Sequence, residues 1–121
     1  MSRIVHFEIM ADKPDDLLSF YNNVFGWESH KWDGPMDYWL VKTGEEGVGI
    51  NGGVARKQEG FPSVVNIIDV DSVDDFVAKI ESAGGTIIIP KMPIPGVGWT
   101  AYANDPEGNM FGIMQADASV S

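Results

Sequence analysis

An internal repeat constrains this chain more than any other feature of its sequence. Shifting the sequence by 59 residues aligns residues 5–9, VHFEI, with residues 64–68, VVNII, and residues 15–17, DDL, with residues 74–76, DDF. The sequence therefore contains two copies of a unit in which a strand is followed by a helix. Self-similarity at a fixed period indicates that one supersecondary unit is used two times.

Each copy predicts one helix and three further strands. Apolar residues at helical spacing predict helices near 14–25 and 73–84. Strand-like segments follow each helix: 27–32, 36–43 and 47–55 in the first copy, and 86–92, 97–103 and 109–116 in the second. The register of these later strands is 61, and the Pro-rich stretch 90–98 is predicted to be a loop over the mouth of a cavity.

The predicted fold class is α+β. Two βαβββ modules, about 3–57 and 61–116, would form a single domain over residues 1–121. Their curved mixed sheet is expected to surround a cavity that both modules share. A chain of 121 residues is long enough to bury one core of its own.

The composition excludes several classes of function. Eighteen acidic and eight basic residues give a formal charge of −10, which disfavours nucleic acid as a partner because phosphate needs a basic face. The acidity suits either a cationic ligand or plain solubility. Without cysteine there is no disulfide or thiolate, and no apolar run is long enough to span a membrane. The first residues carry no apolar leader, so a cytoplasmic location is expected.

His6 and Glu8 form the most reactive pair in the predicted strands. Alternation places both on one face of the strand at 4–9, opposite Val5, Phe7 and Ile9. Two interpretations stay open for His6: a histidine hydrogen-bonded to Glu8 or to the backbone, or a direct contact to a ligand. His30, the other histidine, has no repeat-related role.

Three separated motifs carry a resemblance to a known family. They are HFEIMADKPDDLLSFYNNVFGW at 6–27, VDSVDDFVAKIESAGG at 70–85 and IPGVGWTAYANDPEGNMFGIMQ at 94–115. In these motifs the chain resembles the vicinal oxygen chelate superfamily, which includes glyoxalases, bleomycin-resistance proteins and ring-cleaving dioxygenases. It is most similar to the small proteins described as related to lactoylglutathione lyase.

The resemblance implies four metal-ligand positions, one on each of four strands. They fall on His6, Asn51 (or its neighbour Ile50), Val65 and Gly112, and of these His6 alone is a good ligand. Metal sites need three or four protein donors. We therefore expect no cofactor, and a divalent metal would need Glu8, Asp37 or Asp69 to supply ligands from unexpected places.

Alternation and the resemblance together predict the side chains that line the cavity. At least one of Trp39 and Trp99 is expected to face it, the alternative being a place in the core or in a dimer interface, and Gly112 is expected to leave room for a ligand. The predicted ligand-binding residues are His6, Glu8, Met10, Trp39, Asn51, Val65, Ile67, Trp99, Met110, Gly112 and Met114. An apolar lining with a few polar groups is typical of a pocket for a small organic molecule.

Three functions are consistent with this sequence. The first is a metal-free protein that binds a small organic ligand, as the drug-resistance branch of the family does. The second is a lyase or isomerase related to glyoxalase, with Glu8 as catalytic base and His6 as its partner in proton transfer. In the third the cavity is closed and the protein acts through its surface. The resemblance implies a homodimer, because members of this fold commonly complete or enlarge the ligand site across a two-fold contact, and exposed sheet edges also favour covering.

Overall fold

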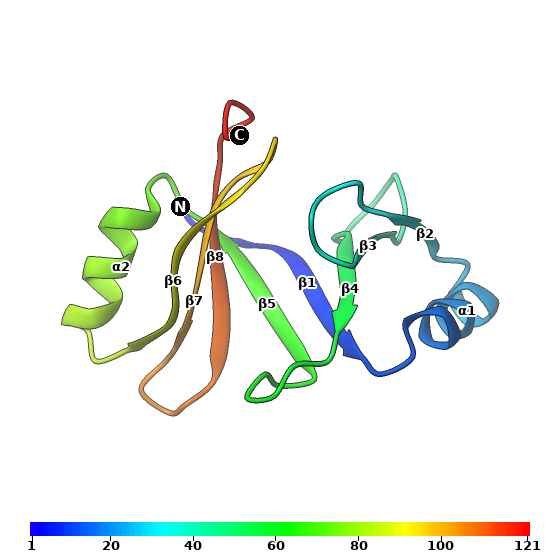
Figure 1. Ribbon diagram of the computed structural model, residues 1–121, viewed down its shortest axis with the longest axis horizontal. Helices are drawn as coiled ribbons and strands as arrows, with labels where there is room; N and C mark the ends of the chain where they lie inside the picture. The colour runs from blue at the N-terminus through cyan, green and yellow to red at the C-terminus, as the bar shows by residue number, and fades with distance from the viewer. The chain divides into compact units, whose positions relative to one another are not determined.

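Two βαβββ modules follow one another in the computed structural model, which describes residues 1–121 (Figure 1). The elements are β1 (Ile4–Ala11), α1 (Pro14–Phe25), β2 (Glu28–Lys31), β3 (Tyr38–Lys42), β4 (Gly52–Arg56), β5 (Val64–Asp69), α2 (Val73–Ser82), β6 (Thr86–Ile94), β7 (Gly98–Asn104) and β8 (Met110–Ala116). The α+β class and the repeated module are confirmed. Neither helix is long and apolar enough to cross a membrane.

The chain divides into two compact units. The first is Val5–Val65, and the second combines Met1–Ile4 with Asn66–Ser121. The four N-terminal residues belong to the second unit, where the Asp69 amide donates to the Arg3 carbonyl over 3.0 Å and the Arg3 amide donates to Asp69 Oδ1 over 2.6 Å. A cavity shared by both modules stays a prediction.

In the first unit the strand order is β2-β3-β4-β1. Strands β1 and β4 are parallel, and the other neighbours are antiparallel. Helix α1 covers one face, where Ala11, Val41 and Val54 form a buried cluster with Leu17 and Leu18. A parallel pair needs a long crossover, and α1 with β2 and β3 provides it.

Local sequence signals determine where α1 begins and ends. Pro14 occupies the first turn, where its missing amide hydrogen has no helical partner to lose, and Asp15 and Asp16 complement the positive end of the helix. Gly26 ends the helix with φ of 76°, and its amide donates to the Asn22 carbonyl over 2.9 Å.

The second unit repeats this architecture with the strand order β5-β8-β7-β6. Strands β5 and β8 are parallel. The Ser72 hydroxyl caps α2 by accepting from the Asp75 amide over 3.2 Å. One face of α2 packs on the sheet around Val73, Ala101 and Ile113.

Strand β6 corrects the prediction of a loop at 90–98. It continues to Ile94, and Pro93 pairs with Trp99 of β7, so that only residues 95–97 form the turn. Because β6 is an edge strand of its unit, a proline there breaks no ladder on the free side. Between Ile87 and Met92 the pairing of β6 with β7 shifts register, as at a β-bulge, so that the strand accommodates Pro90.

The predicted strand at 47–55 is also shorter than expected. Strand β4 starts at Gly52, and residues 43–51 form a loop. Asn51 holds that loop, since its Oδ1 accepts from the Thr43 amide over 2.9 Å. The Thr43 hydroxyl donates to the Ile50 carbonyl over 2.7 Å.

Replacing Gly98 by alanine should destabilise the protein. An added Cβ would lie 1.9 Å from the Gln115 carbonyl oxygen, and backbone on the paired strand cannot move aside as a side chain could. We expect Gly98→Ala to lower the free energy of unfolding by about 1–3 kcal/mol in urea titrations. Gly44→Ala is the control, because open space surrounds Gly44, and its change should stay within about 0.5 kcal/mol. Equal stability of the two variants would contradict the prediction.

Candidate functional site

A hydrogen bond between His6 and Tyr38 is the centre of the candidate site. His6 lies on β1 and Tyr38 on β3, with β4 between them. The distance from His6 Nε2 to the Tyr38 hydroxyl oxygen is 2.6 Å, and the two rings are near-parallel with an interplanar angle of 16°. The Tyr38 side chain therefore crosses β4 to reach His6.

Gly53 makes this crossing possible. A Cβ built on Gly53 would lie 2.0 Å from the Tyr38 hydroxyl oxygen and 2.2 Å from the ring carbon that carries it. Any other residue at this position would compete with Tyr38 for the same space. Glycine inside a strand often marks such a close approach.

Burial disfavours the charged form of His6. Burial lowers the pKa of His6 below its ordinary value of 6.5, and the negative charge of Glu8 raises it in part. A neutral imidazole has one donor and one acceptor nitrogen. The Tyr38 hydroxyl uses Nε2, which leaves Nδ1 with the opposite role.

Glu8 and Met10 share the face of His6. They are buried, with 8% and 7% of their surfaces exposed, while Phe7 and Ile9 pack on the helix side of the sheet. Predicted alternation of this strand is thus confirmed. On the edge strand β2, three strand positions from β1, His30 is exposed and cannot reach His6, because neighbouring strands lie about 4.8 Å apart.

The positions that would hold a metal do not carry donors. Val65 is a fully buried aliphatic residue, and Gly112 has no side chain. No group of three or more His, Cys, Asp or Glu side chains in residues 1–121 is placed to hold a metal ion. The residues present therefore do not fit the metal that metal-using members of the resembled superfamily hold.

Strand pairing corrects the position assigned to Asn51. Glu8 pairs with Gly53, and 59 residues later Ile67 pairs with Gly112. The repeat partner of Gly112 is therefore Gly53, in the same register of 59 that relates β1 to β5. Gly53 also lacks a donor, and Asn51 serves the loop instead.

Two carboxylates that could have supplied ligands from elsewhere are engaged. The Arg56 guanidinium at 3.0 Å, followed by the Lys31 ammonium at 3.3 Å, holds the pKa of Asp37 below its ordinary value. The Asp69 carboxylate accepts from the Arg3 amide.

In the second unit the space at Gly112 is filled, and the expectation that it leaves room for a ligand is wrong. A Cβ there would lie 2.6 Å from Ile67 Cδ1 and 3.1 Å from the Tyr102 ring. Met110 and Met114 lie half-buried on the same strand as Gly112.

Both tryptophans lie on helix-covered faces, as the alternative of a place in the core expects, so the prediction that at least one of them faces the cavity is wrong. Trp39 packs against the α1 cluster, with Arg56 5.5 Å and Lys31 5.8 Å from its ring centre. Trp99 packs against the α2 cluster, with Lys91 4.6 Å from its ring. The cation–π contacts of these lysine and arginine side chains stabilise the two rings in these positions.

Tyr38 is the site residue that the sequence prediction missed. Alternation in YWLVK puts Tyr38 and Trp39 on opposite faces of β3, so only one of them can share the face of His6. The pair Gly52-Gly53 was the available signal, since it indicates that something crosses β4 closely.

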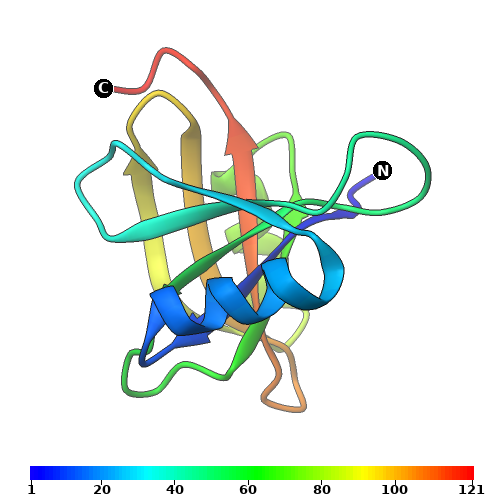
Figure 2. The ribbon, with the colours of Figure 1, turned by 90° about the vertical axis from the view of Figure 1, so that its right-hand side faces the viewer.

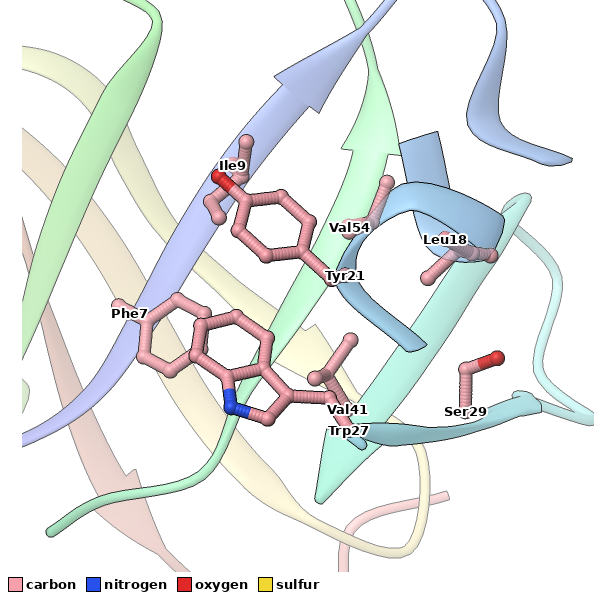
Figure 3. Close-up of a pocket in the computed structure, with 8 residues that line it drawn as sticks. All are labelled: Phe7, Ile9, Leu18, Tyr21, Trp27, Ser29, Val41 and Val54. Atoms are coloured by element: carbon pink, nitrogen blue, oxygen red, sulfur yellow. The ribbon is translucent and has the colours of Figure 1, made fainter. Parts of the chain in front are cut away.

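The space between α1 and its sheet is packed and does not form a ligand pocket. In Figure 3 the Trp27 ring lies across Phe7, and the rings of Tyr21 and Trp27 are stacked 4.7 Å apart at 5°. The cavity that remains has room for one water molecule at most. Its lining residues are Phe7, Ile9, Leu18, Tyr21, Trp27, Ser29, Val41 and Val54.

Known proteins similar to this chain fall into two groups. A provisionally named glyoxylase of Mycobacterium bovis, CFP32, is 32% identical over 111 residues, which are 89% of this chain and 42% of that protein. The chain thus spans less than half the length of this curated relative.

Solved structures share the fold at low identity. The hypothetical protein BH1468 from Bacillus halodurans C-125 has a TM-score of 0.75 at 14% identity, covering 99% of this chain and 98% of that one. Methylmalonyl-CoA epimerase from Mycobacterium tuberculosis has a TM-score of 0.68 at 12% identity, covering 93% and 87%.

A family model describes nearly the whole chain. It matches residues 3–113, which include β1 with His6, both helices and the inner strand β8 up to Ile113. The chain belongs to the glyoxalase/bleomycin resistance protein/dioxygenase superfamily.

Proposed function

We propose that this chain binds a small organic ligand on the face of the first unit that carries His6, Glu8 and Tyr38, and that it does so without a resident metal. The observation that carries the proposal is the bond from His6 Nε2 to the Tyr38 hydroxyl. One of the two imidazole nitrogens of His6 already has a protein partner at 2.6 Å, and the side chains of Gly53, Val65 and Gly112 offer no donor atom to a metal.

The chemistry of this face selects among ligands. A neutral imidazole and a phenol offer hydrogen bonds without charge, and Glu8 adds negative charge close enough to affect the pKa of His6. With a formal charge of −10 on the whole chain, a neutral or cationic polar ligand is favoured over an anion.

Proton transfer at the same face is the second candidate function. Glu8 is buried beside His6, and a buried carboxylate next to an imidazole is a common arrangement for removing a proton next to a carbonyl group. Several chains of the same fold are methylmalonyl-CoA epimerases. The test is an assay for proton exchange next to a carbonyl group in acyl-CoA compounds. If the wild type catalyses this exchange and Glu8→Gln does not, proton transfer becomes the first candidate function.

A screen of neutral and cationic aromatic compounds tests binding. Compounds that bind the native state should raise the melting temperature. We expect His6→Ala to weaken the binding of the best compounds by about 1–3 kcal/mol, because a buried polar contact is lost. His30→Ala, on the exposed edge strand, is the matched control and should leave binding unchanged. Compounds that bind both variants equally would place the ligand elsewhere.

Divalent metals should not stabilise the protein. Zinc, nickel, manganese or iron(II) would raise the melting temperature only if the native chain offered a site, and the donor set is incomplete. We expect no rise with any of these ions and less than one bound metal per chain after dialysis. A stoichiometric metal with His6 among its ligands, detected by X-ray absorption, would overturn the metal-free proposal.

Acid should destabilise the wild type more than a variant without His6. The folded chain has a lowered pKa at His6, so below about pH 6.5 the unfolded chain binds the proton more readily than the folded chain does. The folded state therefore loses stability as the pH falls through about 6.5 toward the lowered pKa that His6 has in the folded chain. The free energy of unfolding, measured in urea, should decline more steeply for the wild type than for His6→Gln. Parallel curves would show that His6 titrates normally.

A further inference from the structure

We propose that Trp32 is a positioning residue of the proposed ligand face: it holds the Tyr38 ring in the orientation in which the Tyr38 hydroxyl meets His6. This inference deepens the proposed function and rests on it, because His6 and Tyr38 carry the face that is proposed to bind a ligand. Trp32 directly follows the last residue of β2, and it acts on the ligand only through Tyr38.

The Tyr38 side chain reaches His6 diagonally across the sheet. Tyr38 pairs with Ala55 of β4, whereas Gly53 pairs with Leu40, two residues further along β3. The tip of Tyr38 nevertheless lies at Gly53, because a Cβ built there would collide with the Tyr38 hydroxyl. Diagonal neighbours on antiparallel strands are about 7–8 Å apart, a distance that an aromatic side chain can span. Strand pairing therefore allows this direction of the ring but does not select it.

Contact with the Trp32 ring selects the orientation of Tyr38. The two rings meet edge to face, with their centres 6.4 Å apart and an interplanar angle of 80°. Edge-to-face is a favoured arrangement of aromatic pairs at this separation. Gly53 leaves room for the Tyr38 ring but has no side chain to support it, so the ring needs a contact from another element to keep one rotamer.

The loop at 32–37 holds Trp32 in place. Its two ends meet where the Trp32 amide donates to the Tyr38 carbonyl over 2.8 Å. Within the loop, the Trp32 ring occupies the space that a side chain at Gly34 would fill. In Figure 2 this loop, in cyan, joins β2 to β3 at the left of the view. Because the half-buried Trp32 ring is supported by its own loop, it can serve as a fixed contact for Tyr38.

Asp37 ties the end of this loop to two strands. Its carboxylate lies 3.3 Å from the Lys31 ammonium on β2 and 3.0 Å from Arg56 Nε on β4. The three side chains are about half exposed, so these ion pairs contribute little to stability. They do restrain the residue that directly precedes Tyr38. The backbone at Tyr38 is therefore fixed, and the contact with Trp32 acts on the rotation of the side chain.

The second unit provides an internal comparison. Strands β6 and β7 are joined by residues 95–97 alone, whereas residues 32–37 separate β2 from the start of β3. Tyr102 of β7 pairs directly with Gly112 and fills the space beside it without a diagonal reach. The longer loop with its tryptophan thus occurs in the unit where a tyrosine has to be directed toward a histidine.

Imidazole ¹⁵N NMR on the full chain tests the positioning role without a ligand. Trp32→Ala should release Tyr38 from His6 and expose the imidazole, so that the pKa of His6 rises toward its ordinary value of 6.5, since burial is the main cause of its lowering. Trp32→Phe keeps an aromatic edge and should titrate nearly as the wild type does. Met36→Ala, at a half-exposed position of the same loop, is the matched control and should leave the titration unchanged. The chain has two histidines, so His30→Gln assigns the His6 signals.

A double-mutant cycle with the best compounds of the binding screen tests whether Trp32 acts through Tyr38. Trp32→Ala should weaken binding at least about fivefold in the wild type and less than about twofold in the Tyr38→Phe background, where the positioned hydroxyl is already absent. Equal losses in the two backgrounds would show that Trp32 contacts the ligand directly and would overturn the proposal.

The two measurements separate this inference from ligand binding itself. If no compound binds, the proposed function fails, and the NMR titration alone decides the role of Trp32. A His6 pKa that is the same in the wild type and in a Trp32→Ala variant shown to be folded by circular dichroism would overturn the positioning role, even where ligands bind. If Trp32→Ala does not fold, Trp32→Leu fills the loop without an aromatic edge, and an unchanged His6 pKa in that variant would equally overturn it.

Discussion

The alternation of β1 is the constraint on which the first unit depends. Phe7 and Ile9 pack toward α1, and a strand that buries these residues must present His6 and Glu8 on its other face. A slip of one residue would exchange the two faces and move a histidine and a carboxylate into the apolar core, which is costly. The contacts that build the core therefore also hold the polar face in place.

Glycines in the two inner strands determine what each polar or apolar face becomes. At Gly53 the Tyr38 side chain passes over β4 and forms a hydrogen bond with His6. At the repeat-related Gly112 the corresponding space is filled by Ile67 and Tyr102. The first repeat thus retains a hydrogen-bonded polar pair where the second is filled by apolar and aromatic groups. A hydrogen-bonded polar face in one module and a filled face in the other follow from the same backbone.

Much of the fold could be predicted because its signals are local. Both helix starts, Gly26 and the repeated strand–helix register depend on neighbouring residues, and the structure confirms them. The sequence-based predictions were wrong where the pairing with a neighbouring strand determines which way a side chain faces or whether a proline is tolerated. Trp39 faces α1 because of how β3 pairs with β4, and β6 tolerates its prolines because it is an edge strand.

By itself the sequence determined the two modules, the family and the absence of donor atoms at Val65 and Gly112, because no folding can add a ligand atom to valine or glycine. Only the tertiary structure decided that Tyr38 is the partner of His6, 32 residues away, and that Asn51 serves a loop. Such contacts depend on the pairing of β3 and β4 with β1, and strand register between distant segments is set by the packing of whole faces, which no local pattern records.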